Sequence, residues 1–329
     1  MTYPLLAIIT FTLSWLLIKT LRHHLQNHLI DIPNQRSSHT NPTPSAGGLG
    51  FATAFALTLP LAPQPTIPPT LWLSLIPLTL ISLLDDWREI PMGLRFIIHI
   101  ATATAIVHQC GPLPTPWLSP PLTYGLTILT VTALINFYNF MDGLDGILAG
   151  VTTIQLSFLA LWNHLPILWL AVASLLGFLR WNWAPAKIFM GDTGSTLLGA
   201  LIAIALLYPH QTPTHAWHTL PILLPLMGDA TYTLIRRLCQ GKNILQAHRT
   251  HISQRLQRSG WSHSTVATTY ILATTTIALS LWCIPTAPLF ILSSAPFAII
   301  LCEIYFSRRL TDPDTPAQPT KPNLPSPTT

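Results

Sequence analysis

Eleven apolar stretches, separated by short polar connections, run through the 329 residues of this chain. An α-helix that crosses the hydrocarbon core of a bilayer takes about 20 apolar residues, and most of the stretches approach that length. The pattern therefore predicts an all-α polytopic integral membrane protein with about 11 transmembrane helices. The predicted helices cover residues 4–22, 47–62, 68–84, 94–110, 121–138, 147–163, 165–182, 196–209, 217–237, 265–283 and 287–306.

The lysine and arginine residues fall in alternate connections between these stretches. Short connections rich in Lys and Arg stay on the cytoplasmic side of a membrane, so the basic connections are predicted to be cytoplasmic. This places the N-terminus in the periplasm and the C-terminus in the cytoplasm of a bacterial inner membrane. One cytoplasmic connection, around residues 136–146, contains no basic residue.

Composition excludes two other classes of protein. Half of the residues are apolar and only 8% are charged, which leaves too little polar surface for a soluble domain of this size. The net charge of +5 is spread over helix ends, so it favours contact with anionic lipid over binding of nucleic acid. We expect one transmembrane catalytic domain over residues 1–310 and a disordered tail, rich in Pro and Thr, over residues 311–329.

Two groups of acidic residues stand at predicted cytoplasmic helix ends. Asp85 and Asp86 end the third stretch, where adjacent carboxylates need a cation or substrate to offset their charge. The alternative is an ordinary solvated helix end, with Arg88 and Arg95 as partners.

The second group, Asn136 to Gly146, includes Asn139, Asp142 and Asp145. Asp142 and Asp145 would share one face of a helix, and Gly143 and Gly146 are expected to break the helix and re-aim these groups. Solvated Asp-Gly turns are the alternative, but turns alone do not explain asparagines inside an apolar helix end.

Three further segments carry candidate ligands. Asp192 precedes the eighth stretch, where Asp192, Thr193 or Ser195 could equally cap the helix. His248, Arg249 and His251 lie in the largest cytoplasmic connection and suit a nucleotide sugar, or else form a basic segment that lies on anionic lipid. Lys187, Arg36 and His39 are candidates for contact with phosphate.

Five aspartates thus end helices on one side of one membrane with few basic neighbours in their own motifs. A divalent cation would offset that charge. Carboxylates with open water positions suit Mg²⁺, with Mn²⁺ as a substitute, whereas the Cys and His ligands of Zn²⁺ are absent from these motifs. Such a cation suits phosphoryl transfer. The five are Asp85, Asp86, Asp142, Asp145 and Asp192.

These motifs, in this order over about residues 30–260, resemble those of the polyprenyl-phosphate N-acetylhexosamine-1-phosphate transferases. The resemblance implies transfer of a sugar 1-phosphate from a UDP-N-acetylhexosamine to undecaprenyl phosphate, with release of UMP. It implies that Asp192 binds Mg²⁺ and that Asp85 or Asp86 engages or deprotonates the lipid phosphate. Asn139, Asp142 and Asp145 would line the nucleotide and metal site, with Asp142 also a metal ligand.

The helix count and the sequence His248-Arg249-Thr250-His251 resemble the branch that initiates O-antigen and polysaccharide synthesis more than the phospho-MurNAc-pentapeptide transferases of the peptidoglycan branch. His248 and His251 would then contact the diphosphate or the sugar. The sugar stays open among GlcNAc and its 6-deoxy relatives, and a homodimer also stays open. In relatives, Arg and Gly stand where this chain has Ser45 and Ala46, so the role of that loop in phosphate binding is in question.

Two other classes of function compete with this interpretation. An ion-coupled secondary transporter would place its charges near the membrane midplane in repeated halves, whereas here they lie at helix ends without an evident repeat. An intramembrane metal hydrolase would use similar aspartates, but the chain lacks an HExxH-like ligand set.

Overall fold

A computed structural model of the chain describes residues 2–25, 29–33, 38, 41–63, 67–208, 213–243 and 248–309. The predicted phosphate contacts Arg36 and His39 and the tail over residues 311–329 lie outside the described residues. The helices are α1 (Tyr3–Leu25), α2 (Gly48–Thr58), α3 (Pro69–Leu73), α4 (Ile76–Trp87), α5 (Met92–Cys110), α6 (Pro120–Met141), α7 (Ile147–Trp162), α8 (Leu168–Asn182), α9 (Gly191–Leu207), α10 (Pro213–Thr219), α11 (Leu224–Cys239), α12 (Ile252–Arg258), α13 (His263–Cys283) and α14 (Ala287–Arg309).

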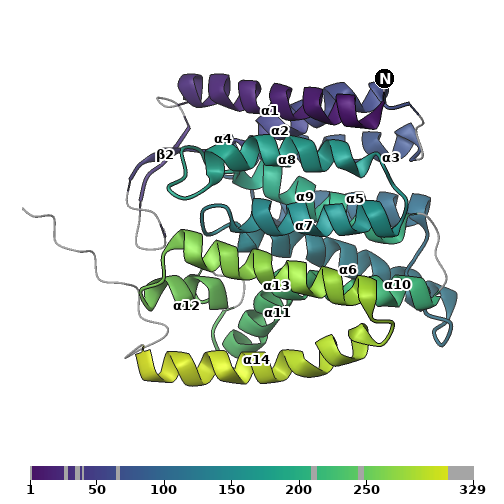
Figure 1. The fold of residues 1–329 in the computed structure, drawn as a ribbon, viewed down its shortest axis with the longest axis vertical. Coiled ribbons are helices and arrows are strands. Elements are labelled where there is room, and N and C mark those ends of the chain that lie inside the picture. The colour runs from purple at the N-terminus through teal and green to yellow at the C-terminus, as the bar shows by residue number, and fades with distance from the viewer. Residues whose placement is uncertain are drawn as a thin grey trace, which may run out of the picture.

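The helices form an all-α bundle whose long members lie side by side with nearly parallel axes (Figure 1). Each predicted apolar stretch contains helix, although prolines interrupt some of them. Pro77 stands in the first turn of α4, just after α3, and Pro225 stands in the first turn of α11, which follows the 3₁₀ turn Leu220–Leu223. Proline lacks a backbone N–H and is best tolerated in a first helical turn.

The bundle belongs in a membrane. Five helical segments are long and apolar enough to cross one, namely Tyr3–Leu25, Pro69–Trp87, Pro120–Met141, His263–Cys283 and Ala287–Arg309. Four shorter apolar helices, Gly48–Leu61, Ile147–Trp162, Leu168–Asn182 and Gly191–Leu207, pack among them. The number of spans and the direction of the termini stay predictions from the sequence.

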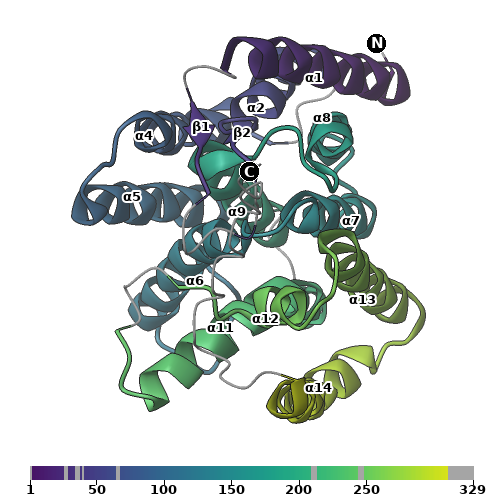
Figure 2. The same cartoon turned by 90° about the vertical axis from the view of Figure 1, so that its left-hand side faces the viewer.

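The centre of the bundle is α9, which is buried from Thr193 to Leu207 and contacts α2, α4, α5, α6 and α7 (Figure 2). Its small residues allow neighbouring backbones to approach closely. A Cβ added at Gly48 would lie only 2.4 Å from Gly194 Cα, and one at Gly199 would lie 2.8 Å from Ile135 Cα. Close packing through small residues is typical of helix contacts in membranes, and it fixes the N-terminal end of α9.

One end of the bundle carries irregular backbone that the apolar pattern did not predict (Figure 1). Strands β1 (Ile30–Asp31) and β2 (Thr43–Pro44) form a short antiparallel pair. The chain after β2 then pairs with the segment before α9, since Gly47 N–H donates to Phe189 O and Gly48 N–H donates to Met190 O, both at 2.8 Å. These bonds hold the loops that precede α2 and α9 against each other.

Candidate active site

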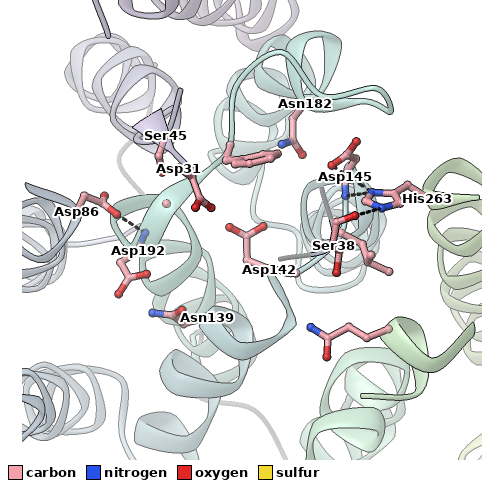
Figure 3. Close-up of a pocket in the computed structure, with 15 residues that line it drawn as sticks. Asp31, Ser38, Ser45, Asp86, Asn139, Asp142, Asp145, Asn182, Asp192 and His263 are labelled. Atoms are coloured by element: carbon pink, nitrogen blue, oxygen red, sulfur yellow. Dashed lines mark hydrogen bonds and ion pairs between the residues drawn. The ribbon is translucent and has the colours of Figure 1, made fainter. Parts of the chain in front are cut away.

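A polar cavity of about 310 Å³ opens at this end of the bundle, where the ends of α4, α6 and α9 meet (Figure 3). Among the predicted residues, Asn139 and four of the five aspartates line it, and Asp85 lies just outside. The lining residues are Asp31, Ser38, Ser45, Asp86, Asn139, Asp142, Gly143, Leu144, Asp145, Asn182, Phe189, Gly191, Asp192, Gln254 and His263. Helix ends that are far apart in the sequence therefore converge on one acidic site.

Asp86 joins the end of α4 to the start of α9. Its Oδ1 accepts the Asp192 N–H at 2.8 Å, and its Oδ2 accepts the N–H and the hydroxyl of Thr193 at 3.1 and 2.6 Å. The first amides of a helix have no partner within the helix, and a carboxylate there is further stabilised by the helix dipole. Asp86 thus caps α9 from another helix, whereas the sequence suggested a cap from Asp192, Thr193 or Ser195.

Glycine is required where this cap approaches α9. Gly191 has a φ of +74°, a left-handed conformation that L side chains rarely adopt. A Cβ at this position would lie 2.7 Å from Asp86 Oδ1. The glycine before Asp192 therefore lets the Asp86 carboxylate lie against the start of α9.

Arg95 in α5 connects two of the predicted acids. Its Nη1 donates to Oδ2 of Asp85 and, at 3.0 Å, to Oδ2 of Asp192. The other oxygen of Asp85 accepts the Ile90 N–H at 2.7 Å. One guanidinium nitrogen is therefore shared between the ends of α4 and α9.

Asp142 lies in the connection without basic residues. As predicted, the helix breaks here, because α6 ends at Met141 and Gly146, with a φ of +73°, precedes α7. Burial raises the pKa of Asp142 to about 8, and the carboxylates of Asp192, Asp86 and Asp145 add to the rise. In the absence of a cation, its surroundings therefore favour the protonated, neutral form of the Asp142 carboxyl group.

Asp145 is held by two neighbouring segments. Its Oδ2 accepts the Ala186 N–H at 3.0 Å, and its Oδ1 lies 3.3 Å from Nδ1 of His263 at the start of α13. The other ring nitrogen of His263 lies 3.0 Å from Ser38 O. His263 thus connects the acidic loop to Ser38 in the connection between β1 and β2, on the side of the cavity away from Asp86 (Figure 3).

The His248 connection contributes differently from the sequence interpretation. His251 is 2% exposed and lies outside the lining residues, with its Nδ1 3.4 Å from Asp229 Oδ1. Asp229 also accepts the N–H groups of Ile252 and Ser253 at 2.7 and 3.0 Å, and so caps α12. Residues 250–256 of this segment are buried, whereas His248 and Arg249 are half-buried, so its packing disfavours the alternative of a basic segment lying on anionic lipid.

The other predicted substrate contacts, His248, Arg249 and Lys187, are also not among the residues that line the cavity. Arg249 donates to Ser38 Oγ at 3.1 Å, and Nδ1 of His248 lies 3.2 Å from the Thr250 hydroxyl. Lys187 is exposed, with its ammonium 5.8 Å from the centre of the Trp181 ring. Their roles in substrate binding stay predictions.

Comparison with known proteins identifies the family. The model of Glycosyl transferase family 4 matches residues 69–210. A Bacillus subtilis (strain 168) protein named "Probable undecaprenyl-phosphate N-acetylglucosaminyl 1-phosphate transferase" is 31% identical over 256 residues, 71% of this chain and 71% of that protein. The chain belongs to glycosyl transferase family 4.

Two further family 4 relatives are named "Undecaprenyl-phosphate alpha-N-acetylglucosaminyl 1-phosphate transferase". The Escherichia coli (strain K12) protein is 29% identical over 259 residues, 71% of this chain and 70% of that protein. The Yersinia pestis protein is 29% identical over 295 residues, which cover 80% of this chain and 78% of that protein. These relatives confirm the resemblance seen in the motifs, and they favour a transferase over a transporter or a hydrolase.

Sequence reasoning missed several residues of this family 4 site. Arg95 was considered only as the partner of a solvated helix end. Gln254 in α12 and His263 in α13 also line the cavity. The Gln254 side chain lies against the acidic loop, since a Cβ added at Gly143 would lie 2.6 Å from Gln254 Nε2. Asn182 accepts the Gly146 N–H at 3.1 Å and donates to Ile188 O at 3.0 Å. A lone polar residue at a helix end gives no sign of such distant partners.

The family resemblance implies Mg²⁺, and the donor atoms of the cavity suit that ion. The acidic part offers carboxylate oxygens and the amide of Asn139, which hydrogen-bonds the Asp192 carboxylate. Among the described residues, no three acidic, His or Cys side chains form a ready-made cage. Mg²⁺ is usually held by one or two carboxylates together with substrate phosphates, so an incomplete set fits this ion. Asp142 and Asp192 are the residues that would hold it.

Proposed function

We propose that this protein transfers N-acetylglucosamine 1-phosphate from UDP-N-acetylglucosamine to undecaprenyl phosphate on the cytoplasmic side of a bacterial inner membrane. The observation that carries the proposal is the convergence of Asp86, Asn139, Asp142, Asp145 and Asp192 on one cavity at a helix end. Family membership and the names of the relatives support the choice of substrates. A site at the membrane surface can meet one water-soluble and one lipid-borne substrate.

In the proposed reaction, an oxygen of the lipid phosphate attacks the phosphorus that carries the sugar. A new P–O bond forms, and the bond from that phosphorus to the oxygen bridging the two donor phosphates breaks. The bridging oxygen leaves with UMP, and the product is undecaprenyl-diphospho-N-acetylglucosamine. A phosphate monoester has a second pKa near 6, so the acceptor is already largely ionised at neutral pH and needs no strong base.

The residues divide into two proposed groups. Asp142 and Asp192 bind the divalent cation, which supplies positive charge to the diphosphate during transfer. Asp86 has both oxygens engaged by α9, so its proposed contribution is to hold Asp192 at the edge of the cavity. Asp85 is held by Arg95 and the Ile90 N–H, so its proposed contribution is to hold Arg95 rather than to act as a free base.

The test uses purified full-length protein, Mg²⁺, undecaprenyl phosphate and separate UDP-sugars. We expect UMP release that requires the lipid and is fastest with UDP-N-acetylglucosamine. The panel also includes UDP-N-acetylfucosamine, UDP-N-acetylquinovosamine and UDP-MurNAc-pentapeptide, so the same assay separates polysaccharide initiation from the peptidoglycan branch. UMP release without the lipid, or none with any donor, would contradict the proposal.

Asp192→Asn tests the cation role. This variant should insert into the membrane and purify in detergent like the wild type. It should lose turnover, because the substitution removes one of the two negative charges proposed to hold Mg²⁺. Exposed Glu89, close to Asp85 and Asp86 in sequence, provides a matched control as Glu89→Gln, which should retain full activity. Wild-type turnover in Asp192→Asn would remove Asp192 from the proposed ligand set.

A further inference from the structure

Arg95 occupies the position of a counter-ion within the acidic cluster. It contacts Asp85 and Asp192 through one nitrogen, Nη1, and its buried Nε has no hydrogen-bond partner among the described residues. The strong form of an Arg–carboxylate pair uses two parallel N–H···O bonds to one carboxylate. A single nitrogen shared between two acids is a weaker arrangement that can be rearranged at low cost.

Asp192 is also the residue that the proposed function gives to the divalent cation. A guanidinium and a divalent cation on the same carboxylate would place like charges a few ångströms apart, in a site where Asp142 and Asp192 are half-buried. Such repulsion is costly in a partly buried environment. The two positive groups therefore compete for Asp192.

Asp85 offers Arg95 a second partner. Its carboxylate is fixed by the Ile90 N–H at 2.7 Å and already accepts the same guanidinium nitrogen. Asp85 also lies outside the lining of the cavity. When a cation occupies Asp192, the guanidinium can remain bound to Asp85 alone.

We propose that Arg95 is a positioning residue that opposes cation binding: it neutralises Asp192 in the cation-free site and is retained by Asp85 when the cation binds. This inference rests on the proposed function through the cation role of Asp192. It makes Asp85 a partner of Arg95 and not a ligand of the metal.

The experiment measures cation binding rather than turnover. Purified full-length variants are titrated with Mn²⁺ alone, and free Mn²⁺ is measured by electron paramagnetic resonance. Arg95→Gln should lower the Kd for Mn²⁺ about tenfold, because a neighbouring positive charge is removed. Asp85→Asn should raise the Kd, because Arg95 then pairs with Asp192 only. Arg88→Gln, a matched control at an exposed arginine in the same connection, should leave the Kd unchanged.

The double variant Arg95→Gln/Asp85→Asn separates the two roles of Asp85. If Asp85 acts through Arg95, the double variant binds Mn²⁺ as tightly as Arg95→Gln, so the effects are not additive. If Asp85 were a cation ligand, the double variant would bind more weakly than Arg95→Gln, and the role assigned to Asp85 would be overturned. A Kd for Arg95→Gln equal to or above that of the wild type would overturn the competition itself.

Thermal unfolding gives an independent measurement. In EDTA, Arg95→Gln should be less stable than the wild type, because the acidic cluster has lost its counter-ion, and Mg²⁺ should raise its Tm more than it raises that of the wild type. Should this variant fail to fold in EDTA, Arg95→Lys takes its place. Its Kd for Mn²⁺ is expected to lie between those of Arg95→Gln and the wild type. A Kd equal to or above that of the wild type would overturn the inference. Wild-type protein that neither binds Mn²⁺ nor gains stability from Mg²⁺ would instead overturn the cation role on which the inference rests.

Discussion

Asp86 and Thr193 are joined by two hydrogen bonds, because Oδ2 of Asp86 accepts both the main-chain N–H of Thr193 at 3.1 Å and its hydroxyl at 2.6 Å. The pair connects the end of α4 to the first turn of α9. Since Asp192 precedes Thr193, this connection also sets the position of the Asp192 carboxylate. A carboxylate that looked catalytic in the sequence is therefore also part of the framework of the site.

Removal of this cap should destabilise the protein. Asp86→Ala leaves three donors at the start of α9 without their acceptor, and we expect a loss of about 2 kcal/mol in the free energy of unfolding. Turnover should fall as well, because Asp192 loses its support. Thermal unfolding in detergent measures the first effect. Glu89→Gln is the control, and an unchanged Tm in Asp86→Ala would contradict the capping role.

Gly191→Ala should cause a similar loss. The added Cβ would lie 2.7 Å from Asp86 Oδ1, and alanine at a φ of +74° is strained. Gly93 in α5 has no atom within 4 Å of an added Cβ, so Gly93→Ala provides the matched comparison. This control should be neutral or up to about 1 kcal/mol more stable, since alanine favours the helix. Equal Tm changes in the two variants would argue against the close contact.

Ala46→Gly should stabilise the protein. Ala46 has a φ of 68°, a left-handed conformation that costs an L residue roughly 1–2 kcal/mol and that glycine adopts readily. The comparison is Ala56→Gly, an exposed position inside α2, where glycine should cost about 1 kcal/mol. The two substitutions are chemically identical, so opposite changes in Tm would isolate the backbone conformation. A lower Tm in Ala46→Gly would contradict the strain.

The raised pKa of Asp142 predicts that the protein becomes less stable as the pH rises from acid to neutral. The pKa of this carboxyl group is about 8 in the folded chain against an ordinary value of 3.8, so between these values the folded state holds a proton that the unfolded state has lost. Stability in EDTA should therefore fall as pH rises through this window, by at most about 1.4 kcal/mol per pH unit from this group.

Asp142→Asn tests that dependence. In EDTA, the variant should lose less stability than the wild type between pH 5 and pH 8, and it should have the higher Tm at pH 8. Mg²⁺ should raise the Tm of the wild type at pH 8, since it favours the ionised carboxylate, but should have a smaller effect on the variant. Parallel Tm curves for the two proteins would show that Asp142 does not titrate in this range.

Much of the fold follows from local sequence. Every predicted apolar stretch contains helix, because a chain in hydrocarbon must satisfy its backbone hydrogen bonds within each segment. The boundaries are less well predicted: α9 begins at Gly191 and not at residue 196, so that Asp192 falls inside its first turn. That shift follows from the cap supplied by Asp86, which no local pattern reveals.

The sequence alone determined the membrane class, the acidic helix ends and the family to which they belong, because apolar length, composition and short motifs are properties of neighbouring residues. Only the tertiary structure decided which polar groups meet. Arg95 bonds Asp192 across 97 positions, and His263 contacts Ser38 across 225. His251 is buried beside Asp229, a pairing that the sequence interpretation did not foresee. Such pairings depend on how helices pack around α9, and packing is set by side chains that lie far apart along the chain.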